Sequence, residues 1–127
     1  MLTDTIADFA TRVRNASKVG KDTVVLKNTK LVKAVADVMV AERYLQEATL
    51  QEDGNLKVVL MYVAGKPAIN SIKKISKPGV RIYKKSNELS KVLSGLGLGI
   101  ISTSSGVMSN TAATRAHLGG EVLLELW

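Results

Sequence analysis

The apolar residues near the start of the chain recur with the spacing of a helix. They occupy positions i, i+3, i+4 and i+7: Ile6, Phe9, Ala10 and Val13. This spacing places their side chains on one face of a helix. A capping side chain precedes them, from Thr3, Asp4 or Thr5, so the pattern predicts a helix that runs to about Ala16.

The segments that follow alternate between strand and helix patterns. Thr23-Val-Val-Leu-Lys27 predicts a short strand, and a second helix is expected from Lys30 to about Tyr44, capped by Asn28 or Thr29. Its apolar stripe should contain Leu31, Val35, Val38, Met39 and Glu42, widened by Val32 and Ala36.

An Asp-Gly pair at residues 53 and 54 predicts the tight turn of a β-hairpin. The two strands should be 48–51 and Asn55–Val63, and the second, which is apolar on both faces, should be central in its sheet. Gly65-Lys-Pro67 interrupts this pattern and predicts a boundary between two lobes. We therefore expect an N-terminal lobe at 1–65, made of a helix, a strand, a helix and a β-hairpin.

The remaining residues, 66–127, predict a second lobe of mostly β structure with short helices. Its expected elements are a basic strand at 69–75, a type II turn around Pro78 and Gly79, short helices at 86–93 and 110–117, and a last strand from Gly119 to Trp127. The chain shows no internal repeat. The two lobes together predict an α+β fold.

Composition narrows the possible classes of protein. The chain has 127 residues, of which 46% are hydrophobic, and it contains no cysteine. The lack of cysteine excludes disulfide bonds and thiolate metal sites. No apolar run approaches the roughly 20 residues that a membrane span requires, and no targeting segment is recognisable after Met1. We therefore expect a soluble protein of a reducing compartment, without membrane contact.

The net charge of +7 is concentrated in one segment. No acidic residue occurs between Asp53 and Glu88, and this interval holds eight basic residues: Lys57, Lys66, Lys73, Lys74, Lys77, Arg81, Lys84 and Lys85. Such a block on strands and turns fits a polyanionic partner, although a solvated basic face is the alternative. Lys30 and Lys33 add a second signal, since cations at a helix N-terminus are unfavourable unless an anion is bound there.

Two further groups of residues suggest that the polyanion is RNA. Arg81 and Tyr83 should project together from one face of a strand, where they could stack on an unpaired base or form only a surface cation–π contact. Later in the chain, an apolar strand should end in the hydroxyl run Ser-Thr-Ser-Ser at 102–105, followed by Gly106. Small hydroxyl residues can approach a sugar-phosphate backbone closely, but they can equally bond to their own backbone in an ordinary turn.

Residue patterns typical of enzymes are scarce. His117 is the only histidine, and no nucleophile-elbow spacing places a serine for a Ser-His-Asp triad. Gly95-x-Gly-x-Gly99 differs from a dinucleotide-binding motif, because Ile100 stands where that motif needs glycine. No metal-ligand spacing or phosphate-binding loop occurs, so no cofactor, metal or small-molecule substrate is expected. An enzyme that uses the serine run and His117, and a basic protein–protein module, remain as alternatives.

Several segments together resemble the bacterial-type ribosomal protein S8 family of the small ribosomal subunit. The matching segments run in the family's order across nearly the whole chain: Asp4-Thr-Ile-Ala-Asp8, 11–16, 65–67, Ile75-Ser-Lys-Pro-Gly-Val-Arg-Ile-Tyr83, 95–97, Ile101-Ser-Thr-Ser-Ser-Gly-Val-Met108 and 119–127. The resemblance implies two α+β lobes and a non-enzymatic protein of a cytoplasmic or organellar ribosome. It would bind rRNA of the central domain, contact neighbouring ribosomal proteins and help the platform to assemble. Some bacterial members of the family also bind the messenger RNA of their own operon and repress its translation.

The resemblance also implies roles for individual positions. The hydroxyl loop is the family's main RNA contact, Arg81 and Tyr83 would lie near the irregular core of the RNA helix, and Asp4, Arg14 and residues 28–30 would lie toward its backbone. Together with the basic block and the second helix, this gives the candidate RNA-binding residues Asp4, Arg14, Asn28, Thr29, Lys30, Lys33, Lys57, Lys73, Lys74, Arg81, Tyr83, Lys84, Ser102, Thr103, Ser104, Ser105 and Gly106.

Two positions depart from the family pattern. Ser105 stands where the family often has a basic residue, so one phosphate contact is expected to be missing. Thr5 stands where the family often has proline, and this difference concerns only how the first helix begins.

Overall fold

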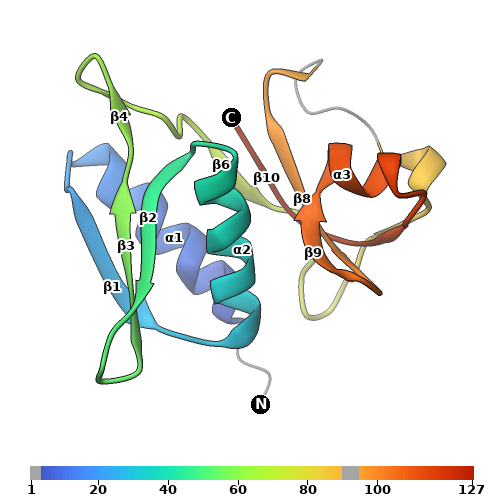
Figure 1. Ribbon diagram of the computed structural model, residues 1–127, viewed down its shortest axis with the longest axis horizontal. Helices are drawn as coiled ribbons and strands as arrows, with labels where there is room; N and C mark the ends of the chain where they lie inside the picture. Colours follow the sequence, from blue (N-terminus) through green and yellow to red (C-terminus); the bar gives the residue numbers. More distant parts are fainter. Residues whose placement is uncertain (1–3, 90–94) are drawn as a thin grey trace.

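The computed structural model describes residues 4–89 and 95–127, and it consists of helices and antiparallel strands (Figure 1). In chain order the elements are α1 (Thr5–Lys18), β1 (Thr23–Lys27), α2 (Lys30–Ala41), β2 (Leu45–Leu50), β3 (Asn55–Leu60), β4 (Tyr62–Val63), β5 (Lys66–Pro67), β6 (Ile72–Lys74), β7 (Tyr83–Lys84), the 3₁₀ helix η1 (Ser86–Glu88), β8 (Leu98–Thr103), β9 (Gly106–Ser109), α3 (Asn110–Arg115) and β10 (Gly120–Leu126). The expected α+β fold class is confirmed.

Asp4 caps the first helix, α1. Its carboxylate accepts a hydrogen bond from the backbone N–H of Ala7 at 3.0 Å, which satisfies one of the free donors of the first turn. The apolar face predicted from the sequence is buried, and it continues to Ala16. The helix itself runs to Lys18 and ends before Gly20, whose φ of +73° suits a residue without a side chain.

The second helix, α2, begins where the sequence predicts but ends three residues earlier. Thr29 is its cap, because the hydroxyl oxygen accepts a hydrogen bond from the N–H of Val32 at 3.1 Å. The buried side chains are Val32, Val35, Ala36 and Met39. The expected stripe was therefore partly wrong, since Leu31 is 37% exposed. The helix ends at Ala41 because Arg43 adopts a positive φ of 65°.

A three-stranded antiparallel sheet lies against α1 and α2 in the strand order β1–β3–β2 (Figure 1). The strand β3 is central, as its apolar sequence predicts, and a turn with Gly54 at a φ of +87° connects it to β2. Only one of its faces is buried, through Leu56, Val58 and Leu60. The hairpin strand 55–63 ends early, at Leu60, and residues 62–63 pair instead with β5.

The second sheet has the order β6–β10–β8–β9, and β7 also pairs with β10. The basic strand expected at 69–75 is confirmed only for Ile72–Lys74. The turn around Pro78 closes as expected, since the N–H of Val80 donates to the carbonyl of Lys77 at 3.0 Å. It is not a type II turn, because Gly79 lacks the positive φ which that type requires.

The two short helices of this part of the chain differ from expectation in length. The first is confirmed only as η1, and the backbone N–H of Lys85 donates to the Glu88 carboxylate at 2.8 Å. Leu89 is already extended, which ends the helix, and residues 90–93 of the expected helix lie outside the described residues. The second, α3, is capped by Ser109, whose hydroxyl accepts a hydrogen bond from Ala112 N–H at 3.1 Å.

The last strand, β10, contains a β-bulge that its sequence does not indicate. Strict alternation would place Val122 and Leu124 on one face and Leu123 on the other. The register shifts between residues 122 and 124, and all three of these side chains are buried. As a result, Val122 packs with Ile101 and Ala113, whereas Leu123 and Leu124 belong to the main core.

The main hydrophobic core draws residues from both parts of the chain. Phe9, Val35 and Val58 share it with Ile100 and Leu126. The division of the chain into lobes at residues 65 and 66 stays a prediction. In the described residues, no helix combines the length and the apolar character that crossing a membrane requires.

Candidate nucleic-acid interface

The hydroxyl run forms the tip of the β8–β9 hairpin. Ser102 and Thr103 are the last residues of β8, Ser104 and Ser105 form the turn, and Gly106 begins β9, paired with Thr103. Gly106 has a φ of +112°, and a Cβ there would meet no atom within 4 Å. Glycine is therefore needed for its backbone conformation and not for space.

The hydroxyls of this hairpin have different uses. Thr103 Oγ1 donates to the carbonyl of Gly106 at 2.7 Å and accepts from the N–H of Ser105 at 3.1 Å. Thr103 therefore follows the simpler alternative, in which a hydroxyl stabilises its own turn. Ser104 and Ser105 are exposed at the tip, and Ser102 is half-buried beside a cavity.

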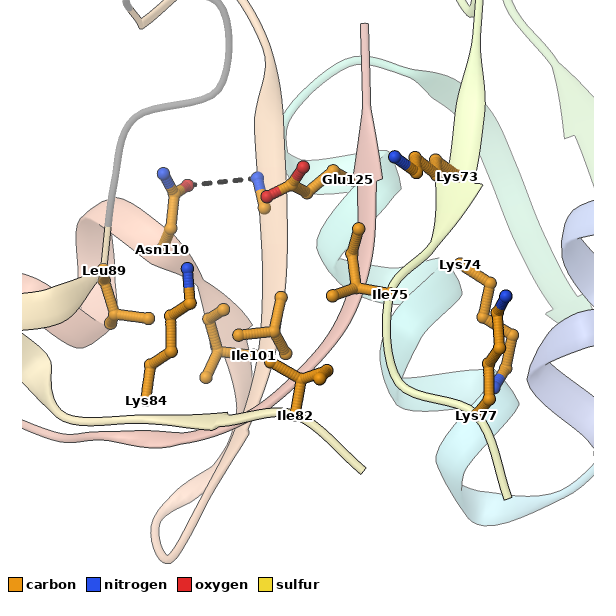
Figure 2. Close-up of a pocket in the computed structure, with 12 residues that line it drawn as sticks. Lys73, Lys74, Ile75, Lys77, Ile82, Lys84, Leu89, Ile101, Asn110 and Glu125 are labelled. Atoms are coloured by element: carbon orange, nitrogen blue, oxygen red, sulfur yellow. Dashed lines mark hydrogen bonds between the residues drawn. The ribbon is translucent and has the colours of Figure 1, made fainter. Parts of the chain in front are cut away.

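Three lysines of the basic block lie apart from this hairpin loop. Lys57 is on β3, on the face of the first sheet opposite the helices, next to Val25 of β1. Lys73 and Lys84 line a cavity of about 300 Å³ whose floor is formed by isoleucines, with Glu125 also at its edge (Figure 2). The structure does not bring these three lysines together with the serines.

A second cavity, of about 130 Å³, does bring several candidate residues together. It is lined by Ser102, Arg81, Lys74 and Asp4, with Leu31 at the start of α2 also on its wall. These residues come from three separate parts of the sequence: the cap of α1, β6 with the 77–82 segment that follows it, and β8. We call this cavity, together with the exposed tip Ser104–Gly106, the candidate interface.

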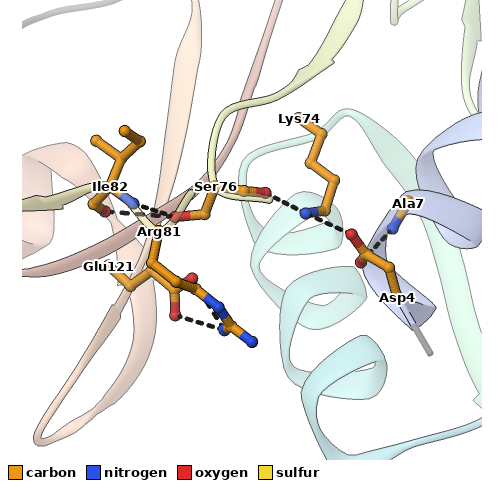
Figure 3. Close-up of polar contacts among 7 residues, drawn as sticks. All are labelled: Asp4, Ala7, Lys74, Ser76, Arg81, Ile82 and Glu121. Carbon is orange, nitrogen blue, oxygen red and sulfur yellow. Dashed lines mark hydrogen bonds and ion pairs between the residues drawn. The ribbon is translucent and has the colours of Figure 1, made fainter. Parts of the chain in front are cut away.

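Lys74 is held by two acceptors inside the candidate interface (Figure 3). Its ammonium lies 2.6 Å from a carboxylate oxygen of Asp4 and donates a hydrogen bond to the carbonyl of Ser76. The side chains of Lys74 and Asp4 are only 17% and 23% exposed. Partial burial raises the pKa of Asp4, but the hydrogen bonds from Lys74 and Ala7 and the Lys74 charge outweigh it, so this pKa is lowered.

Arg81 makes an ion pair with Glu121, at 3.2 Å (Figure 3). The arginine side chain is 49% exposed and the glutamate 14%. In β10, Glu121 stands opposite both Ser102 and Tyr83. Tyr83 is 68% exposed, so an aromatic face is available near the pair.

Sequence reasoning missed Glu121 and Ser76. Ser76 is 2% exposed, and its hydroxyl accepts from the N–H of Ile82 at 2.8 Å and donates to the carbonyl of Ile82 at 3.4 Å. These bonds fix the base of the turn that carries Arg81. A search for positive charge overlooks an acidic residue and a buried hydroxyl. The only available signal was the alternation that placed Glu121 on one face of the last strand.

Most of the remaining candidates bond to other residues of the protein, and none of them lines the candidate interface. Arg14 donates to the carbonyl of Ile72 at 2.5 Å and so connects α1 to β6. Lys33 forms an ion pair with Asp37 at 2.6 Å, and Lys30 is exposed.

The two residues that precede α2 also belong to the candidates. Asn28 has a buried side-chain oxygen for which the described residues supply no hydrogen-bond donor. Thr29 uses its hydroxyl as the cap of α2.

No arrangement typical of an enzyme appears in the part of the chain that the structure describes. No group of three or more His, Cys, Asp or Glu side chains there could hold a metal ion. His117 follows α3 with a φ of +56°, and it does not line the cavity beside Ser102.

Comparison with known proteins gives the family. The sequence model of ribosomal protein S8 matches residues 4–127. A protein of Brevibacillus brevis named small ribosomal subunit protein uS8 is 45% identical, over all of this chain and 99% of that protein. A protein of the same name from Heliobacterium modesticaldum is 42% identical, again over all of this chain and 99% of that protein. The chain belongs to the ribosomal protein S8 family.

Membership of the ribosomal protein S8 family confirms the resemblance noted in the sequence. The family consists of structural, non-enzymatic proteins of the ribosome, so the enzyme alternative is set aside. One departure from the S8 pattern also receives an explanation. Thr5 occupies the first helical position behind the Asp4 cap, and the helix begins there without proline.

Proposed function

We propose that this chain, a structural protein of the small ribosomal subunit, binds rRNA of the central domain through the candidate interface. The observation that carries the proposal is the cavity in which Ser102 meets Arg81, Lys74 and Asp4, next to an exposed serine tip. Binding there would help the platform of the subunit to assemble, beside neighbouring ribosomal proteins.

The chemistry of the interface suits RNA of A form. The major groove of such RNA is deep and narrow, so proteins contact its shallow minor groove, its 2′-hydroxyls and its unstacked bases. Ser104 and Ser105 are exposed on a narrow turn, and each hydroxyl can donate and accept a hydrogen bond. The tip therefore fits sugar hydroxyls and base edges, which are neutral groups.

Tyr83 and the Arg81–Glu121 pair supply the groups that an unstacked base requires. The exposed ring of Tyr83 is a surface for stacking. Arg81 is held in place by Glu121, which fixes the direction of its guanidinium near Ser102. A held arginine recognises a fixed geometry better than a free one, because less conformational entropy is lost on binding.

Lys73, Lys84, Lys30 and Lys57 are proposed as contacts to phosphates at the edge of the RNA. In the described residues none of the four has an ion-pair partner. Phosphate contacts fix the position of the RNA and make its affinity depend on salt. We also propose that the same interface binds a similar hairpin in the messenger RNA of the protein's own operon.

The contribution of the serines is tested by replacing Ser102 and Ser104 with alanine. Each lost hydrogen bond should cost about 1–3 kcal/mol, so we expect the double variant to bind a central-domain rRNA hairpin at least tenfold more weakly. Thr103 is left unchanged because it stabilises the turn. Thr111→Ala, an exposed hydroxyl on α3, is the matched control. Unchanged affinity in the folded double variant would remove the hairpin tip from the interface.

A further inference from the structure

Lys74 differs from its neighbours in the basic block. Among the eight basic residues between Asp53 and Glu88, only Lys74 and Arg81 have ion-pair partners in the described chain. The pair of Lys74 with Asp4 is the less exposed of the two. Lys73, the preceding residue, points to the other cavity and is exposed (Figure 2).

The ammonium of Lys74 cannot bind a phosphate without weakening interactions that it already makes within the protein. It donates to a carboxylate at 2.6 Å and to the carbonyl of Ser76, so two of its three donors are in use. The third donor remains, but the Lys74 side chain is only 17% exposed, and the charge of Asp4 beside it offsets its attraction for a phosphate. A full phosphate contact would therefore draw the ammonium away from both acceptors. Asp4 would then keep a partly buried charge with no cation beside it, which is unfavourable.

Because the pair of Lys74 and Asp4 lies within the candidate interface, it affects how RNA would bind there. Lys74 and Asp4 line the same cavity as Ser102 and Arg81. A free lysine there would bind the phosphates of any RNA, since phosphate contacts carry no sequence information. With Lys74 paired, the groups left to bind at this point are the Ser102 hydroxyl, the positioned arginine and Lys77, which also lines the cavity and is exposed. One phosphate contact fewer is then made there, and a larger share of the binding falls to groups that contact sugars and bases.

We propose that Asp4 is a specificity-determining residue, which withholds Lys74 from RNA phosphates by holding its ammonium against the carbonyl of Ser76. The inference rests on the RNA-binding function proposed above. It predicts that Lys74 contributes nothing to the salt dependence of binding in the wild-type protein. It also predicts that removal of the Asp4 charge turns Lys74 into a non-specific phosphate contact.

Asp4→Asn is the appropriate change because asparagine caps helices as well as aspartate does. The hydrogen bond from Ala7 N–H can therefore remain. Asp8→Asn is the matched control: it changes the net charge equally and also breaks a pair on α1, with Arg12 at 3.0 Å, but that pair is exposed and does not line the interface. Circular dichroism and thermal unfolding confirm that each variant is folded.

Binding is measured by fluorescence anisotropy with a central-domain rRNA hairpin and with a scrambled hairpin of equal length. One added phosphate contact steepens the salt dependence, so between about 50 and 200 mM salt the affinity of Asp4→Asn should fall roughly threefold more than that of the wild type. At low salt its affinity for the scrambled hairpin should rise, and its preference for the true hairpin should decrease. Asp4→Asn combined with Lys74→Gln should restore the wild-type slope.

The single change Lys74→Gln tests whether Lys74 contacts RNA phosphate in the wild-type protein. We expect a salt slope equal to that of the wild type, whereas Lys73→Gln should flatten the slope. If Lys74→Gln flattens it as much as Lys73→Gln does, Lys74 already contacts phosphate and the proposal is overturned. An unchanged slope in folded Asp4→Asn would also overturn it. A wild-type protein that binds both hairpins equally would instead contradict the proposed function.

Discussion

Close packing at two glycines shows how single residues determine the interface. A Cβ on Gly120 would lie 2.0 Å from the carbonyl oxygen of Ser102, and one on Gly119 would lie 2.5 Å from that of Lys84. Both oxygens belong to the backbones of strands that pair with β10, so they cannot move aside without disrupting the sheet. The position of Ser102 thus depends on the absence of a side chain at Gly120.

Gly120→Ala should destabilise the protein by about 1–3 kcal/mol or more, because the added methyl group collides with backbone. Gly79→Ala is the matched control, since Gly79 has no positive φ and its Cβ would meet no atom within 4 Å. Urea unfolding of both variants measures the difference in the free energy of unfolding. Equal stability of the two variants would show that β10 does not pack against Ser102 as described.

At the residue scale, the sequence indicates the types of residue in the interface but not their partners. Ser102–Gly106 stands out because four hydroxyl residues occur in a row. The need for glycine at position 120 comes from an atom of β8, which no local pattern reveals. The pairing of Arg81 with Glu121 is equally non-local, so the sequence showed a free cation where the structure has an ion pair.

Elements whose ends depend on local chemistry were predicted well, and those shaped by packing were not. The starts of α1 and α2 follow from Asp4 and Thr29, and β1 coincides with its predicted range Thr23–Lys27. The bulge in β10 arises because its two halves pack on different clusters, with Val122 in the smaller one. Alternation in the sequence assumes a regular strand and cannot indicate this change.

The pair of Asp4 and Lys74 connects two elements, the cap of α1 and the strand β6, and predicts a pH dependence of stability. The pKa of Asp4 is lowered in the folded state from its ordinary value of 3.8. A carboxyl group with a lowered pKa contributes stability above its unfolded pKa, and this contribution is lost as the pH falls through the folded pKa. Asp4→Asn removes the titrating group.

We therefore expect the wild-type protein to be more stable than Asp4→Asn at neutral pH, with a difference that shrinks as the pH falls between about 5 and 2. Urea unfolding at several pH values measures this difference, and Asp8→Asn provides the comparison for an exposed pair of the same helix. A difference that stays constant over the whole range would show that Asp4 and Lys74 do not interact as charges.

At the scale of the whole molecule, the basic block indicated the class of partner but not the contact surface. Its residues are spread over the outer face of the first sheet at Lys57, the larger cavity at Lys73 and Lys84, and the ion pairs of Lys74 and Arg81. A count of charge along the sequence treats all of these alike. Their separation results from the way β6, β7 and β10 bring the turn at 77–80 beside the cap of α1.

The most direct test of RNA recognition is a salt titration of the wild-type protein, with a central-domain rRNA hairpin and a scrambled hairpin of equal length. We predict that the true hairpin is preferred by roughly a hundredfold or more, and that the preference persists at physiological salt, because hydroxyl and stacking contacts are less screened than phosphate contacts. Equal affinity for the two hairpins, lost together as salt rises, would contradict the account.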